Sequence, residues 1–161
     1  MTTEYLSETS STIAPIRRAS PLGLRLTFDS TIETTSPPWL RALEKRVESL
    51  LNLPENWDGY GAPRVNWECV MAAFSLILPP NVIHETPAPQ FVPTNQGGIQ
   101  VEWHLDGYDL EVIFDPNEQP RYYHVRADGV EIEGEVAEDP SLVGSLIRAL
   151  PIRNEFNQPT R

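Results

Sequence analysis

Histidine and carboxylate side chains gather on one face of a β-sheet that the sequence predicts between residues 99 and 136. Cross-strand pairing in two predicted hairpins places four pairs on this face: His104 opposite Asp109, Glu102 opposite Glu111, His124 opposite Glu133 and Arg126 opposite Glu131. Imidazole and carboxylate groups in one patch can ligate a metal ion or carry out acid–base chemistry. However, their spacing matches no named metal motif, and strand alternation alone aligns such residues on a solvated sheet face. We therefore predict no catalytic residue, no metal ligand and no cofactor.

One of these pairs is unfavourable as it stands. Glu102 directly opposite Glu111 places two negative charges on neighbouring strands, at a cost of a few tenths of a kcal/mol to about 1 kcal/mol. A nearby cation would relieve the repulsion: Arg25, an arginine of a partner, or a bound ion. The pair therefore predicts a cationic neighbour.

The negative charge of the chain is concentrated in the same region. The net charge is −11, and residues 99–139 hold twelve Asp or Glu against Arg121 and Arg126, a net of −10. Such a surface repels phosphate backbones, so we predict no direct binding of nucleic acid. It suits a basic protein partner or a cation, and it equally suits a face that only keeps the protein in solution.

The first hairpin that positions these residues runs from Ile99 to Phe114. Two segments in which apolar and polar residues alternate flank Asp106-Gly107. A two-residue Asp-Gly loop between such segments is a strong indication of a β-hairpin. With this turn the apolar residues face one another in four pairs: Leu105 with Tyr108, Trp103 with Leu110, Val101 with Val112, and Ile99 with Phe114. All eight fall on one face, as a half-buried antiparallel pair requires.

A second hairpin is predicted from Arg121 to Val136, around Asp128-Gly129. A two-residue loop here sets Ala127 opposite Val130 and Val125 opposite Ile132. This register is the one that turns His124 and Arg126 toward the polar face. A short edge strand at 90–92 is bracketed by prolines, which are tolerated at the edge of a sheet.

Apolar residues at helical spacing predict three helices around the sheet. The first opens at Ser36-Pro37 and carries the stripe Leu40, Leu43, Val47 and Leu50. The second begins near Asn66 and has the inner face Trp67, Val70, Met71, Phe74 and Ile77. The third starts at Pro140. Helices that are separated from the strands along the sequence, together with a meander of strands, predict an α+β fold. The antiparallel sheet has four to five strands, and two N-terminal helices and one C-terminal helix cover one of its faces.

The loop between the first two helices, Leu53–Ala62, contains Trp57, Asp58 and Tyr60, and its glycines at 59 and 61 permit a positive φ. The carboxylate of Asp58 can accept hydrogen bonds from nearby backbone N–H groups. We expect a helix–helix corner with Trp57 largely buried between the helices and Gly59 or Gly61 at positive φ. The alternative is a loop that contacts a partner through Trp57, Asp58 and Tyr60.

The predicted domain organisation is simple. Residues 1–35 read as a mostly disordered tail with a possible strand at 22–28, residues 36–152 as a single α+β domain, and residues 153–161 as a frayed end. The single cysteine, Cys69, excludes an internal disulfide, and we expect it to be a semi-buried structural thiol. Without an apolar span or a signal core, the sequence predicts a cytoplasmic protein.

Two motifs carry a family resemblance. Trp57-Asp58-Gly59-Tyr60-Gly61-Ala62, and Gly97-Gly98-Ile99-Gln100-Val101-Glu102-Trp103 further along the chain, resemble the WDGYGA loop and GGIQxEW strand of a widespread family of small, uncharacterised bacterial proteins. The resemblance covers about residues 38–136 and implies neither an activity nor catalytic residues. Such proteins often occur in mobile or defence-associated neighbourhoods, which favours a partner-binding role, including toxin–antitoxin association.

These observations favour a non-catalytic protein-binding subunit: an antitoxin-like protein, an immunity-like protein or an adaptor. The partner would be a protein with a basic surface; the oligomeric state is left open. The candidate contact residues are Trp57, Asp58, Tyr60, Glu102, His104, Asp109, Glu111, His124 and Glu133. Two alternatives stand beside this hypothesis: a small metal-dependent enzyme that uses His104, Glu102, Glu111 and His124, and an acidic mimic of nucleic acid that blocks a DNA-binding protein.

Overall fold

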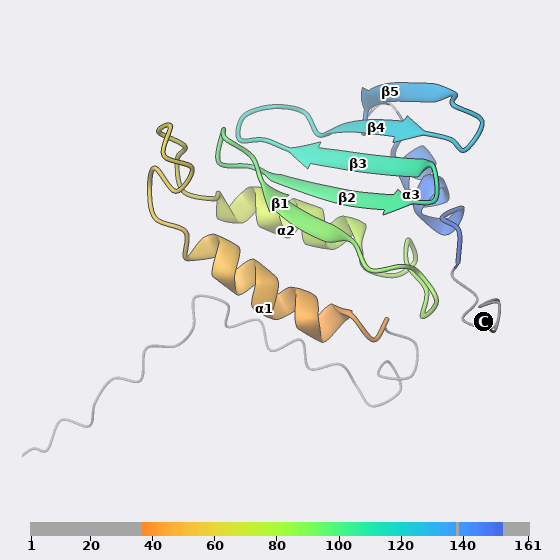
Figure 1. Cartoon of the computed structure of the whole chain (residues 1–161), viewed down its shortest axis with the longest axis horizontal. Coiled ribbons are helices and arrows are strands. Elements are labelled where there is room, and N and C mark those ends of the chain that lie inside the picture. The colour runs from red at the N-terminus through yellow and green to blue at the C-terminus, as the bar shows by residue number, and fades with distance from the viewer. Residues whose placement is uncertain (1–36, 138, 153–161) are drawn as a thin grey trace, which may run out of the picture.

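The computed structural model describes residues 37–137 and 139–152 of the chain (Figure 1). The predicted tail at 1–35 with its strand at 22–28, Ser36 at the predicted start of the first helix, and the C-terminal end from residue 153 lie outside the described residues. The described part is an α+β domain with three helices, α1 (Leu40–Leu51), α2 (Trp67–Leu76) and α3 (Pro140–Arg148). Five antiparallel strands form one meander sheet in the order β1 (Gln90–Pro93), β2 (Ile99–Leu105), β3 (Tyr108–Phe114), β4 (Arg121–Val125) and β5 (Glu131–Glu135). The predicted fold class is therefore confirmed.

The register of the first hairpin is as predicted. Trp103 pairs with Leu110 and Glu102 with Glu111 across β2 and β3. Asp106 and Gly107 at the turn have φ angles of 46° and 83°. Two consecutive positive φ angles define a type I′ turn, which matches the twist of the flanking strands. The Asp-Gly pair therefore fixes both the turn and the face to which each side chain of β2 and β3 points.

The register of the second hairpin was predicted wrongly, by one residue. Val125 pairs with Glu131 and His124 with Ile132. The N–H of Arg126 donates to the carbonyl of Val130 (2.9 Å), so the loop has three residues and ends at Gly129, whose φ is 80°. This is a three-residue hairpin loop with a left-handed glycine at its end. Because side chains alternate along a strand, the one-residue difference reverses the face of every residue in β4 relative to the prediction.

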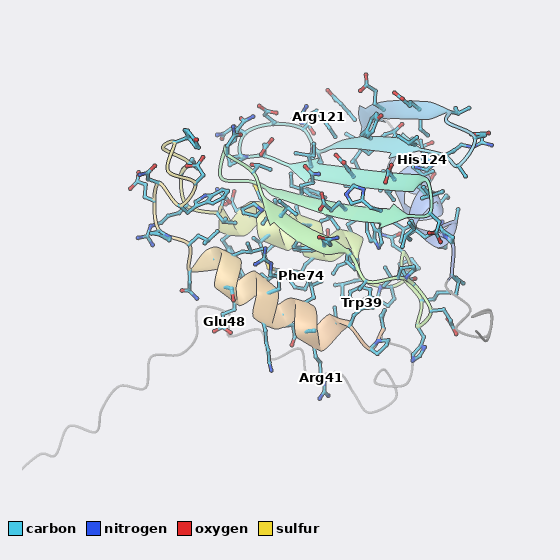
Figure 2. All side chains as sticks on the ribbon, in the orientation of Figure 1. Trp39, Arg41, Glu48, Phe74, Arg121 and His124 are labelled. Atoms are coloured by element: carbon cyan, nitrogen blue, oxygen red, sulfur yellow. The ribbon has the colours of Figure 1, made fainter. Side chains whose placement is uncertain are left out.

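The core lies between the helices and one face of the sheet (Figure 1). Phe74 of α2 meets Phe91 of β1 edge to face, with 5.6 Å between ring centroids, and Figure 2 shows Phe74 beneath the sheet. Trp39 donates from Nε1 to the carbonyl of Thr86 (2.7 Å) and so ties the start of α1 to the segment before β1. The opposite face of the sheet is covered by none of the three described helices.

The helix ends agree with the prediction in part. The second helix begins near Asn66 as predicted, and Asn66 caps it, since its Oδ1 accepts from the N–H groups of Glu68 and Cys69. In contrast, α1 begins at Leu40 rather than at Ser36-Pro37, because Pro37 and the residues after it form a turn closed by a hydrogen bond from Leu40 N–H to Pro37 O. Trp67 is 40% exposed and does not belong to the inner face of α2.

Within the described residues, no helix has the length and apolar character that crossing a membrane requires.

Candidate functional site

The loop between α1 and α2 is held by its own hydrogen bonds. Asn56, Gly59 and Gly61 all have positive φ angles, of 62°, 78° and 96°, so the predicted left-handed glycines are confirmed. The N–H of Asn56 donates to Ala62 O (2.7 Å), and Asn56 Oδ1 accepts from Gly61 N–H (2.7 Å). Asn56 therefore closes the loop through both its backbone and its side chain.

Asp58 makes a second set of hydrogen bonds within this loop. Its Oδ1 accepts from the N–H groups of Tyr60 (2.8 Å) and Ala62 (3.0 Å). These backbone hydrogen bonds, led by the one from Ala62, hold the pKa of Asp58 below its usual value, because they stabilise the ionised carboxylate. The loop is thus held by its own hydrogen bonds.

The two aromatic residues of the loop lie differently from the expectation. Trp57 is half-buried rather than buried between the helices: its Nε1 donates to the carbonyl of Pro63 (3.2 Å), and it is not among the described residues that pack against the core. Tyr60 is 94% exposed. The expected corner is therefore confirmed in part: its glycines are left-handed, but Trp57 is only partly buried and does not join the core.

The second candidate surface is the sheet face that the described helices leave uncovered. We call it the acidic face and define it by six carboxylates on β2, β3 and β5: Glu102, Asp109, Glu111, Glu131, Glu133 and Glu135. Arg121, labelled in Figure 2, reaches this face from β4, but its guanidinium lies 3.5 Å from Asp115 and 3.4 Å from Glu118. The described part of this face therefore has a strong excess of negative charge.

His104 lies within this face, between the carboxylates of Asp109 and Glu102. Its Nδ1 is 2.8 Å from Asp109 Oδ1, and its Nε2 is 3.5 Å from Glu102 Oε2. The hydrogen bond with Asp109 and the charge of Glu102 raise the pKa of His104, against the opposing effect of partial burial. The sequence correctly predicted that His104, Asp109, Glu102 and Glu111 lie together.

The correct register adds Tyr123, which the predicted register had turned toward the core. Tyr123 points to the acidic face between Glu111 and Glu133. Glu131 lies on the exposed side of β5 as predicted, together with Glu135. Partial burial and the neighbouring carboxylate of Glu131 raise the pKa of the Tyr123 phenol. Gly129 could have indicated the position of Tyr123, because it permits a three-residue loop as readily as a two-residue loop. The three-residue loop is the one that turns Tyr123 toward the acidic face.

His124 does not belong to the acidic face, contrary to the prediction. It is 1% exposed in the core, where its Nδ1 is 2.8 Å from the backbone oxygen of Asp109 and its ring lies 4.4 Å from that of Tyr108 (His124 is labelled in Figure 2). Arg126 likewise pairs with Asp128 (2.9 Å) rather than with Glu131. A catalytic metal site that requires both His104 and His124 is therefore excluded, because the two side chains lie on opposite faces of the sheet.

Cys69 is buried, more completely than the semi-buried thiol that the sequence predicts. Burial raises the pKa of its thiol, with a smaller effect from the charge of Asp115. A raised thiol pKa keeps the sulfur protonated, so Cys69 is a poor nucleophile.

The described residues thus offer two surfaces, a rigid loop that presents an exposed tyrosine and an acidic sheet face that contains one histidine. Comparisons of the chain with models of protein families, with curated proteins and with solved structures find no match.

Proposed function

We propose that this protein is a non-catalytic binding subunit that recognises another protein through the loop Asn56–Ala62, which we call the Tyr60 loop. The observation that carries the proposal is the 94% exposure of Tyr60 on a loop already fixed by the hydrogen bonds of Asn56 and Asp58. Tyrosine is enriched among the residues that dominate binding energy at interfaces. A side chain displayed on a preordered loop also loses little conformational entropy on binding.

The acidic face supplies the charge of the proposed interface. Six carboxylates on one sheet face attract a partner with a basic surface, and such complementarity acts mainly on the association rate. The Tyr60 loop also coincides with one of the two motifs through which the chain resembles the family of small bacterial proteins. An antitoxin-like, immunity-like or adaptor role fits a subunit that binds through preformed surfaces.

The first test replaces the exposed ring. Tyr60→Ala keeps the backbone N–H that donates to Asp58, so the free energy of unfolding should change by no more than about 0.5 kcal/mol. The affinity for the partner should fall by about 10- to 100-fold, as for an aromatic residue at the centre of an interface. The parent and variant chains are each used to capture proteins from the native host, and the captured amounts are compared. The affinity of both chains is then measured for the protein that the parent captures in larger amount.

Val130→Ala is the matched control, because Val130 is also an exposed apolar residue on a loop but lies in the second hairpin. It should leave the captured protein and its affinity unchanged. If Tyr60→Ala and Val130→Ala capture the same proteins with equal affinity as the parent, the Tyr60 loop is not the contact surface.

The second test removes charge from β5. Glu131, Glu133 and Glu135 are exposed, so replacing all three with Gln should leave the core intact. The association rate with a basic partner should fall by about 3- to 10-fold at low salt, and its salt dependence should flatten, while the dissociation rate stays nearly constant. Surface plasmon resonance at several salt concentrations measures both rates, and an unchanged salt slope would show that the acidic face only keeps the protein in solution.

A further inference from the structure

Three potential ligand atoms converge on the acidic face from two adjacent strands. Glu102 of β2 and Glu111 of β3 are directly opposite each other, and His104 lies two residues further along β2 on the same face. One oxygen of each carboxylate and one ring nitrogen of His104 all lie within 4.8 Å of one another. The first hairpin therefore gathers a mixed set of nitrogen and oxygen donors.

The hydrogen bond between His104 and Asp109 orients the imidazole ring. When Nδ1–H donates to Asp109 Oδ1 (2.8 Å), the lone pair of Nε2 points away from Asp109. Histidines that ligate metals almost always donate their other ring N–H in this way, commonly to a carboxylate. Asp109 therefore holds His104 in the tautomer that a metal ligand needs.

The distance between His104 and Glu102 also fits a metal site. Nε2 and Glu102 Oε2 are 3.5 Å apart, which is longer than a hydrogen bond. Ligands of a tetrahedral zinc ion with bonds of about 2.1 Å lie roughly 3.4 Å from one another. The two atoms are thus separated by about one edge of such a tetrahedron.

Glu102 is held in place on its other side. Its side chain is 14% exposed, and its Oε2 accepts a hydrogen bond from the side-chain amide of Gln100 (2.9 Å). One lone pair of this oxygen is engaged by Gln100, and the second is available to an ion. A divalent cation here would neutralise the charges of Glu102 and Glu111 and relieve their repulsion across the strands.

We propose that Glu102, His104 and Glu111 bind one Zn²⁺ ion, with Asp109 as the positioning residue of His104. An imidazole in the ligand set favours zinc over Mg²⁺ and Ca²⁺, which prefer oxygen ligands. Three protein ligands leave a fourth position for solvent or for a donor from a partner, and Glu102 and His104 border a groove that also contains Glu85 and Gln90. The site lies on the acidic face and contains no residue of the Tyr60 loop, so zinc binding does not require that the proposed function is correct.

Zinc titration of the full chain by isothermal titration calorimetry tests the proposal, after removal of any affinity tag and treatment with a chelator. The parent should bind one equivalent of Zn²⁺ with micromolar or tighter affinity, and excess Mg²⁺ should not compete. Glu111→Gln and His104→Ala should each weaken binding by about 100-fold or more, and Asp109→Asn by about 10- to 100-fold. Glu133→Gln is the matched control: it removes the same charge from the same face, and its affinity should stay within about twofold of the parent.

Nitrogen NMR of the histidine rings provides a second readout, because the chain contains only three histidines. Saturating zinc should shift Nε2 of His104 and leave its Nδ1–H in place, while the exposed His84 should not respond. Circular dichroism of each variant confirms that it is folded. Absence of saturable binding at about 100 µM Zn²⁺, equal affinities of Glu111→Gln and Glu133→Gln, or a zinc-induced shift at His84 instead of His104 would each overturn the proposal.

Discussion

Replacing Trp103 with alanine is expected to lower the free energy of unfolding by about 3–5 kcal/mol. Trp103 is 1% exposed, and its Nε1 donates to the carbonyl of Pro87 (2.9 Å). The substitution removes the largest fully buried side chain among the described residues and leaves the Pro87 carbonyl without this partner. Urea unfolding at equilibrium, followed by circular dichroism, measures the change.

Two further variants separate the causes of this loss. Trp103→Phe keeps most of the apolar volume but removes the hydrogen bond, so it should cost about 1–3 kcal/mol. Trp67→Ala removes a ring of the same type that is 40% exposed, and it should cost less than about 1 kcal/mol. A loss at Trp103→Ala no larger than that at Trp67→Ala would contradict the buried position of Trp103 and with it the register of the first hairpin.

The first hairpin was predictable because local and long-range signals agree. The turn at Asp106-Gly107 requires two left-handed residues, which Asp and Gly tolerate, and the apolar alternation on both sides demands the same register. As a result, the cluster of Glu102, His104 and Glu111 was also predictable as a set of neighbours.

The second hairpin was not predictable from the same rule. Asp128-Gly129 fits a two-residue loop, but Gly129 also suits the left-handed end of a three-residue loop, and the strands around it are too polar to decide between them. The buried residue that decides the register is His124, whose ring binds the backbone oxygen of Asp109. A polar residue that becomes buried through a tertiary hydrogen bond leaves no signal in the hydrophobic pattern.

Trp67 was placed wrongly, and Trp57 only partly correctly, for a related reason. Trp57 lies in the loop after α1 and Trp67 at the start of α2, and pattern alone assigns such large aromatic residues to the core. In the structure, Trp57 bonds to Pro63 within its own loop, and Trp67 is the first residue of its helix. The residues of α2 that are buried in the core include Ala73 and Phe74 instead.

Gly98 offers the other large effect on stability, because no side chain fits at its position. A Cβ atom there would lie 2.2 Å from the backbone oxygen of Phe114 and 2.3 Å from Asp115 Oδ1. The neighbourhood is rigid: the N–H of Gly98 donates to Thr94 Oγ1 (2.9 Å), and that hydroxyl in turn donates to Asp115. We expect Gly98→Ala to lower the free energy of unfolding by about 3 kcal/mol, at the upper end of overpacking effects.

Gly59→Ala is the matched control, because it adds the same methyl group where no atom lies within 4 Å. Gly59 has a φ of 78°, so its substitution should cost only the conformational strain of a left-handed alanine, about 1–2 kcal/mol. Urea unfolding of both variants compares a steric cause with a conformational one. Equal losses of stability would mean that the clash between the added Cβ atom at position 98 and the Phe114 carbonyl relaxes without cost. A larger loss at Gly98 would show that the second glycine of Gly97-Gly98 is required by the close approach of the turn before β2 to the end of β3.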